Sequence, residues 1–208
     1  MSIEPTVFLV DDDPAVRDAV CMCLEAAGMP VESFDSAEQF LDRHGAARPG
    51  CLVLDVRMTG ASGLELQQEL LNRDMALPVV FITGHGDVSL CAEAMKAGAV
   101  DFLEKPFDHE ALLTAVREGL RKDFTLRQQN QRRLALSRRF DRLTPREREV
   151  LGAVVSGQAN KQIAAQLGVS HRTIEIHRSR IMKKVQAKSV AALVCMATLC
   201  GMRSEPLN

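Results

Sequence analysis

Five short strand-like runs, separated by segments with a helical pattern, constrain the fold more than any other feature of the chain. Short apolar runs are typical of strands buried on both faces of a parallel sheet, and parallel strands need crossover helices between them. We therefore predict an α/β domain with a doubly wound, five-stranded parallel sheet in the first half of the chain. The predicted strands cover residues 7–10, 31–34, 51–54, 79–82 and 101–104.

The segments between these runs carry signals for the start of a helix. Pro14 suits a first helical turn, and Ser36 and Gln39 have the spacing of a capping box. The four helices predicted between the strands cover residues 14–27, 36–43, 63–73 and 87–97.

Charge divides the chain into two unlike halves. Residues 1–120 contain 8 basic and 21 acidic side chains, whereas residues 121–208 contain 18 basic and 6 acidic ones, although the net charge is only -1. Such asymmetry favours two domains with different partners, the basic one for nucleic acid. The sequence has no signal-peptide pattern and no apolar run of about 18 residues, so we expect a cytoplasmic chain without membrane contact. Its six cysteines lack metal-ligand spacing and are expected to be reduced, buried thiols.

Polar residues follow four of the five predicted strands. Asp11 and Asp12 come after the first strand, Asp55 after the third, Thr83 after the fourth and Lys105 after the fifth. Because the ligand crevice of an open α/β sheet lies beyond the carboxyl ends of its strands, these side chains are expected to meet. Clustered carboxylates favour a hard cation such as Mg²⁺, and an aspartate can act as a nucleophile towards phosphorus. Lys105 would supply a positive charge to the transferred group, and Thr83 a hydroxyl.

Structural explanations compete with this interpretation for single residues. Asp12 or Asp13 could cap the helix that begins at Pro14, and Lys105 by itself would be an ordinary surface charge. The combination and its order along the chain are far more specific than any one member.

Four motifs resemble the receiver domain of bacterial response regulators: Val10-Asp11-Asp12-Asp13, Leu54-Asp55-Val56-Arg57-Met58, Ile82-Thr83-Gly84-His85-Gly86 and Glu104-Lys105-Pro106-Phe107. The resemblance implies a flavodoxin-like sheet in the order 2-1-3-4-5 with five flanking helices. It also implies that Asp55 is the phosphoacceptor and that Thr83 and Lys105 contact the phosphoryl group. The implied ligands of Mg²⁺ are Asp11, Asp12, Asp55 and the backbone carbonyl of Arg57.

Two positions in this resemblance need separate treatment. Phe102 falls at the family's aromatic switch position, expected to turn inward as Thr83 moves towards the phosphate, although it could be an ordinary strand aromatic. Where the family usually has Met-Pro, this chain has Met58-Thr59. Losing the proline frees φ and restores a backbone N–H, so we expect a more mobile loop after Asp55.

The stretch from residue 108 to about 140 has no proline and a single glycine, Gly119. Its spacing of Leu112, Val116, Leu120 and Phe124 predicts a helix that leaves the first domain and continues. A helical connector, continuous or broken and in part self-associating, and a plain solvated linker both remain open here.

Helix signals recur after this connector. Thr144, Pro145 and Glu147 form a capping box with proline at the first helical position. Asn160 is predicted to cap a helix over 161–167. Gly168 ends it, Ser170 caps the next helix over 171–185, and Ser189 starts a last apolar helix. Two helices joined by this short turn predict a helix-turn-helix.

Helical spacing divides the predicted recognition helix into core and contact positions. Ile174, Ile181 and Val185 are expected to face the core, with Ile176 nearer the DNA groove. Glu175 and His177 are candidates for base contacts and the basic residues for phosphate contacts, with a solvated helix face as the alternative for each. The candidate DNA contacts are Lys161, His171, Arg172, Thr173, Glu175, His177, Arg178, Lys183 and Lys184.

The stretches 143–151, 160–164 and 173–178 resemble the LuxR-type DNA-binding domain, which implies an all-α unit of four helices. Joined to a receiver, this domain indicates the NarL/FixJ family of response regulators, in its FixJ-like branch. The predicted organisation is a receiver over 1–122, a helical linker over 123–140 and a LuxR-type helix-turn-helix domain over 141–208. The resemblance implies a sensor histidine kinase and double-stranded promoter DNA as partners, a homodimer when phosphorylated, and an activator, with RNA polymerase as a further candidate partner.

Two functions from other classes also fit parts of the sequence. A phosphatase of the haloacid-dehalogenase type uses an Asp-x-Asp motif at its first strand, which Asp11-Asp12-Asp13 could provide, although the fused helix-turn-helix argues against an enzyme. An RNA-binding module is the second alternative, and preference for RNA over duplex DNA would support it.

Overall fold

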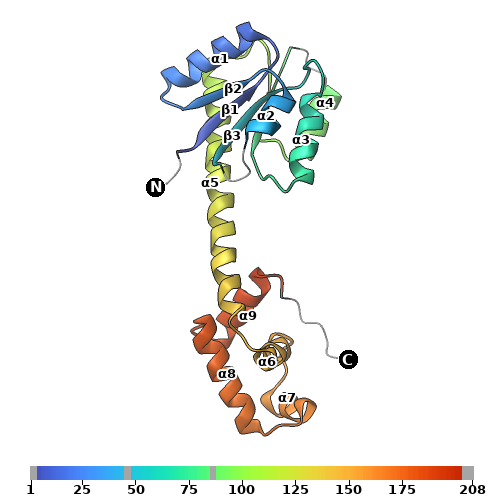
Figure 1. The fold of residues 1–208 in the computed structure, drawn as a ribbon, viewed down its shortest axis with the longest axis vertical. Coiled ribbons are helices and arrows are strands. Elements are labelled where there is room, and N and C mark those ends of the chain that lie inside the picture. Colours follow the sequence, from blue (N-terminus) through green and yellow to red (C-terminus); the bar gives the residue numbers. More distant parts are fainter. Residues whose placement is uncertain (1–3, 45–47, 85–87, 203–208) are drawn as a thin grey trace. The chain divides into compact units, whose positions relative to one another are not determined.

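The five strands form one parallel sheet in the order β2-β1-β3-β4-β5, which confirms the predicted topology (Figure 1). The computed structural model describes residues 4–44, 48–84 and 88–202. Its chain divides into two compact units, Met1–Arg127 and Gln128–Asn208. The strands are β1 (Thr6–Val10), β2 (Val31–Phe34), β3 (Gly50–Asp55), β4 (Val79–Thr83) and β5 (Asp101–Glu104).

Helices cover both faces of the sheet. Alternate residues of β1 show the division, since Phe8 and Val10 pack with α2, α3 and α4, whereas Val7 and Leu9 pack with α1 and the start of α5. All four of these side chains are fully buried, as expected for a strand covered on both sides. The helices are α1 (Pro14–Ala26), α2 (Ala37–Arg43), α3 (Gly63–Asn72), α4 (Val88–Lys96) and α5 (His109–Phe140). Asp87, where we expected α4 to begin, lies outside the described residues.

Side-chain caps fix where these helices begin. The carboxylate of Asp13, and not that of Asp12, caps α1 by accepting a hydrogen bond from the Ala15 N–H at 2.8 Å. Ser36 caps α2 as predicted, but the side chain of Gln39 accepts from the N–H of Asp35 instead of completing a capping box with Ser36. Capping by Asp13 leaves the carboxylate of Asp12 free for another role.

The connector is one uninterrupted helix, α5, from His109 to Phe140. The predicted apolar line along it is only partly right, because Leu112 and Val116 are buried whereas Phe124 is 68% exposed. The neighbouring Asp123 is buried instead and accepts a hydrogen bond from the N–H of Gly50 at 3.1 Å. The side chain of Arg127 donates to Asp123 and to the carbonyl of Arg48. Polar groups at and just before the start of β3 therefore contact α5 as far along the helix as Arg127.

In the second unit, four more helices follow the end of α5 within the residues described, up to 202. Three predicted core residues of α8, Ile174, Ile181 and Val185, are fully buried, and Ile176 is exposed as expected. The prediction that Asn160 caps α7 is wrong: the cap residue is Ala159, and Asn160 is already helical. Gly168 ends α7 in the left-handed conformation, with φ of 65°, which glycine adopts without strain. The helices are α6 (Pro145–Val155), α7 (Asn160–Leu167), α8 (His171–Val185) and α9 (Val190–Leu199).

Six free cysteines are distributed over both units. The expectation of buried thiols is right for Cys51 but wrong for Cys195, which is exposed, and the other four are half-buried. Burial raises the pKa of the Cys51 thiol to about 12. Among the described residues, no helix has the length and apolar character needed to cross a membrane.

Candidate functional site

Parallel strands bring the predicted site residues to one edge of the sheet. In the strand register Val10 pairs with Leu54, Asp55 with Ile82, and Thr83 with Glu104. The residues that follow these positions therefore leave the sheet at the same level, as expected for the carboxyl ends of parallel strands. This register brings Asp11, Asp12, Asp55, Thr83 and Lys105 to that edge.

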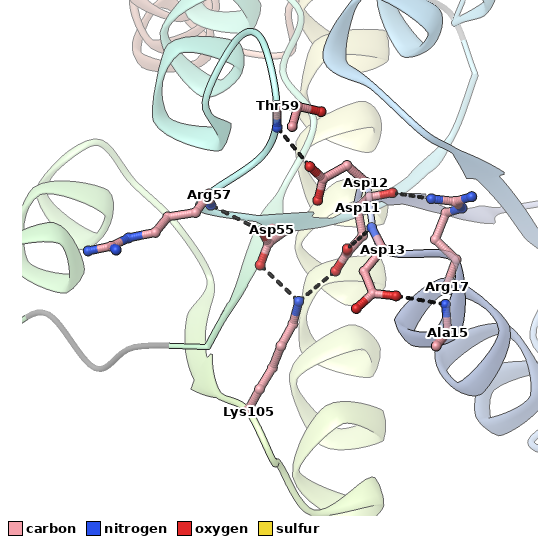
Figure 2. Close-up of polar contacts among 9 residues, drawn as sticks. All are labelled: Asp11, Asp12, Asp13, Ala15, Arg17, Asp55, Arg57, Thr59 and Lys105. Atoms are coloured by element: carbon pink, nitrogen blue, oxygen red, sulfur yellow. Dashed lines mark hydrogen bonds and ion pairs between the residues drawn. The ribbon is translucent and has the colours of Figure 1, made fainter.

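Lys105 joins two buried carboxylates at the centre of this edge (Figure 2). Its Nζ lies 2.7 Å from Oδ2 of Asp11 and 2.9 Å from Oδ1 of Asp55. Asp11 is fully buried and Asp55 is 4% exposed, while the side chain of Lys105 is 21% exposed. Two carboxylates held this close would repel each other strongly without a cation between them. In this structure the ammonium of Lys105 is that cation.

The environment changes the acid–base properties of this pair. Burial raises the pKa of the Asp55 carboxyl, and the nearby Asp11 carboxylate acts in the same direction, against the hydrogen bond from Lys105. Burial alone would lower the pKa of Lys105, but its hydrogen bonds to Asp11 and Asp55 outweigh burial and raise it. Lys105 therefore stays charged beside the Asp55 carboxylate.

A third carboxylate completes an acidic cluster. Oxygen atoms of Asp11, Asp12 and Asp55 lie within 4.8 Å of one another. Opposite ligands of Mg²⁺ lie about 4.2 Å apart, because each Mg–O distance is about 2.1 Å. The three oxygens therefore need only small movements to share one ion, and their chemistry suits a hard cation. The backbone N–H of Arg57 donates to Oδ2 of Asp55 at 3.1 Å, and its side chain points away from the cluster (Figure 2). A ligand role for its carbonyl stays a prediction.

The loop after Asp55 contributes a contact that the sequence did not indicate. The backbone N–H of Thr59 donates to Oδ2 of Asp12 at 2.8 Å (Figure 2). This is the N–H that a proline at the same position would lack. That hydrogen bond lowers the pKa of the Asp12 carboxyl despite the opposing effect of partial burial. The expected mobility of this loop stays a prediction; the amide that the missing proline restores is bonded across to Asp12, after the end of β1.

The two proposed switch residues occupy neighbouring strands. Thr83 is fully buried at the end of β4, and its carbonyl accepts from the N–H of Lys105 at 2.6 Å. Phe102 is half-buried on β5, with its ring centroid 6.3 Å from that of Phe81. Thr83 thus ends the strand next to that of Asp55, and Phe102 lies on the strand beyond it. His85 and Gly86 of the Thr83 motif lie outside the described residues.

In the second unit, α7 and α8 form the predicted helix-turn-helix. Ser170 caps α8, accepting from the Thr173 N–H at 3.1 Å. His171 lies 3.5 Å from Glu175 on the exposed face. The exposed candidates for DNA contact are Lys161, His171, Arg172, Glu175 and Lys183.

The remaining four candidates are half-buried, and three of them make polar contacts within the domain. Arg178 donates to Oδ1 of Asn160 at 2.7 Å, and Lys184 lies 2.6 Å from the carboxylate of Glu147. Thr173 shares a hydrogen bond of 2.8 Å with the hydroxyl of Ser170, and His177 has a buried Nδ1 without a partner. Their roles in DNA binding stay predictions.

Glu147 has a role that sequence reasoning missed. It closes the predicted capping box with Thr144, whose N–H lies 2.8 Å from its carboxylate, and also binds Lys184 of α8. The residue is 3% exposed. The capping box was visible in the sequence, but only the packing of α6 on α8 brings Lys184 to it. The polar contacts of Asp123 were missed for the same reason, since nothing in the sequence links it to Gly50.

Comparisons with known proteins agree with this arrangement. The model of the response regulator receiver domain matches residues 7–117, and that of bacterial regulatory proteins of the luxR family matches residues 141–197. The chain is 47% identical over 196 residues to the transcriptional regulatory protein FixJ of Azorhizobium caulinodans, covering 94% of this chain and 93% of that one. FixJ of Bradyrhizobium diazoefficiens is 39% identical over 205 residues, covering 99% and 100% of the two chains.

Two solved structures extend the likeness to the fold. The response regulator StyR has a TM-score of 0.79 and 45% identity, covering 94% of this chain and 98% of that one. Full-length FixJ from B. japonicum has a TM-score of 0.59 and 39% identity, with both chains fully covered.

Proposed function

Because this chain belongs to the two-component response regulators that join a receiver domain to a LuxR-type DNA-binding domain, we propose that phosphorylation of Asp55 by a partner histidine kinase controls its binding to promoter DNA. The observation that carries the proposal is the buried carboxylate of Asp55, held 2.9 Å from the ammonium of Lys105. The family comprises transcriptional regulators and is not a family of enzymes. The phosphatase alternative also needs Asp13 in the site, whereas Asp13 caps α1.

The proposed reaction is a phosphoryl transfer. A carboxylate oxygen of Asp55 attacks the phosphorus of a phosphohistidine. A P–O bond forms, the P–N bond breaks, and the imidazole leaves with the electron pair and gains a proton. Mg²⁺, held by Asp11, Asp12, Asp55 and the carbonyl of Arg57, would neutralise phosphoryl charge. Lys105, whose ammonium contacts Asp55, would donate a hydrogen bond to a phosphoryl oxygen.

The phosphoryl group then changes the surface of the receiver. It adds negative charge and strong acceptors beside Thr83, whose hydroxyl would move towards it as Phe102 turns inward. We propose that this change favours a homodimer. A dimer presents two copies of α8 to neighbouring half-sites of duplex DNA, and the basic second half makes the binding salt-dependent. The outcome is transcriptional activation, with RNA polymerase as the expected partner at the promoter.

Phosphorylation with acetyl phosphate and Mg²⁺ tests the assignment of Asp55. The wild type should gain one phosphoryl group by mass spectrometry, and Asp55→Asn should gain none. Asp74→Asn is the matched control, because Asp74 is exposed at the end of α3 and has a positive φ of 54°, which asparagine also tolerates. Equal incorporation by the wild type and Asp55→Asn would refute the assignment.

Sedimentation and DNA binding test the output. The phosphorylated wild type should sediment as a dimer and bind promoter fragments more tightly than the unphosphorylated protein, with duplex DNA preferred to RNA of the same sequence. Phosphorylation without a change in either property would refute the coupling, and preference for RNA would support the alternative nucleic-acid module.

A further inference from the structure

We propose that the backbone N–H of Thr59 is a positioning group for Asp12, and that it sets the affinity of the acidic cluster for Mg²⁺ in this chain. The inference rests on the proposed function, because it concerns the ion that the cluster would hold. It assigns a role to a loop residue that belongs to none of the strand-end motifs.

The three carboxylates of the cluster are held in two different ways. Lys105 binds Asp11 and Asp55 at 2.7 and 2.9 Å. Asp12 is half-buried, and its Oδ2 receives the N–H of Thr59 at 2.8 Å from a loop 47 residues further along the chain. The contact from Thr59 occupies only one oxygen of Asp12, so it would remain possible with a cation in the cluster. The other oxygen stays available as a ligand.

The loop that presents this N–H is anchored on both sides. At its start, the N–H of Val56 donates to the carbonyl of Ile82 at 3.0 Å. At its end, the N–H of Gly63 donates to the carbonyl of Val56 at 3.1 Å, and Ser62 begins α3 with a complete capping box. Gly60, next to Thr59, has a positive φ of 87°, which turns the chain without strain. The amide is therefore presented by a loop that is hydrogen-bonded at both ends.

A donor at this position depends on the residue that occupies it. Proline has no N–H, so the Met-Pro sequence usual in the family cannot make this contact, whereas Met58-Thr59 can. Hydrogen bonds to the outer oxygen of a metal-ligating carboxylate orient the ligand, and their loss typically weakens metal affinity by about 10- to 100-fold. Because Asp12 is only half-buried, we expect a value near the lower end of that range.

Substitutions at Thr59 separate the amide from the side chain. Thr59→Pro removes the N–H and should weaken the binding of Mg²⁺ about tenfold. Thr59→Ala keeps the N–H that contacts Asp12 and removes only the hydroxyl. This control should change the affinity by no more than about twofold, a small fraction of the loss expected from the amide. Thr59 is exposed, so neither change disturbs the core.

The experiment is a titration of the full-length protein with MgCl₂, followed by the amide shifts of residues around the cluster, without any phosphodonor. A double-mutant cycle with Asp12→Ala, which removes the acceptor as well as the charge, tests the route: if Thr59 acts through Asp12, Thr59→Pro should have no further effect in the Asp12→Ala background. Equal affinity of the wild type and Thr59→Pro, or tighter binding by Thr59→Pro, would overturn the inference while leaving the proposed function intact. Equal losses in both backgrounds would also overturn it. A wild type that binds no Mg²⁺ would overturn the proposed function as well.

Discussion

Replacing Glu147 by alanine should destabilise the DNA-binding unit, because this buried residue of α6 contacts both Thr144 and Lys184. The carboxylate is 3% exposed, accepts the N–H of Thr144 at 2.8 Å and binds Lys184 at 2.6 Å. Loss of the capping hydrogen bond costs about 1 kcal/mol. Loss of the charged hydrogen bond costs about 2 kcal/mol, below the value for a fully buried pair, because the side chain of Lys184 is 35% exposed and can reach water.

The expected loss of about 3 kcal/mol corresponds to a fall of about 15 °C in the unfolding midpoint of a domain of this size. Glu147→Gln keeps an acceptor for Thr144 and loses the charge, so it should lose about 1 kcal/mol, or roughly 5 °C. Glu149→Ala is the matched control: this exposed residue of the same helix pairs with Arg146 at 2.6 Å, and the change should cost less than about 0.5 kcal/mol.

Thermal unfolding, followed through amide resonances of α6 to α9 in the full-length protein, measures these differences. The pH provides a second check. The pKa of Glu147 is lowered, since its hydrogen bonds outweigh the opposing effect of burial. The stability it contributes is therefore present above the pKa of an unfolded glutamate, about 4.3, and is lost as the pH falls through the lower, folded value. The advantage of the wild type over Glu147→Gln should disappear in that acidic range. If Glu147→Ala is no less stable than Glu149→Ala, the reasoning is refuted.

Three further changes test other contacts. A glycine-to-alanine change normally strengthens a helix, but a Cβ at Gly119 would lie 2.3 Å from Sγ of Cys51. We therefore expect Gly119→Ala to lower the free energy of unfolding in urea by about 1–3 kcal/mol, and Cys51→Ala to reverse that loss. A stabilised Gly119→Ala would contradict the close approach. Asp123→Ala leaves the buried N–H of Gly50 without its acceptor and should lower the free energy of unfolding in urea by about 3 kcal/mol. A loss below about 1 kcal/mol would show that the contact adds little. Arg172→Ala should make the negative slope of log K against log salt for duplex DNA shallower by about 1, because one phosphate contact is lost. An unchanged slope would remove this residue from the phosphate contacts.

Most of the fold and the centre of the site could be predicted because both depend on local patterns. The apolar runs gave the strands, and the parallel arrangement placed Asp11, Asp55 and Lys105 at one edge, where the structure joins them through hydrogen bonds. Helix starts were predicted well where a side chain caps its own helix, as at Ser170 and Thr144.

The failures occur where residues far apart in the sequence decide the outcome. Asn160 has the side chain of a cap, but in the structure that side chain accepts a hydrogen bond from Arg178, 18 residues away. Phe124 continues an apolar spacing, yet at this turn of α5 it is the neighbouring Asp123 that faces the sheet, and the ring of Phe124 is exposed. The contact from Thr59 to Asp12 joins two loops, and no periodicity connects them. Local sequence carries no information about such pairings.

The hydrogen bond from Gly50 to Asp123 also bears on how receivers can be exchanged between relatives. β3 ends at the proposed phosphoacceptor, and its first residue is bonded to a side chain of α5. A chimera joined at residue 122 would take residue 123 from the other parent, and the buried amide of Gly50 would lose its acceptor wherever that residue has no carboxylate. A junction after Arg127 keeps every member of the contact from one parent. The unit of recombination is therefore the sheet together with the helical turns up to Arg127.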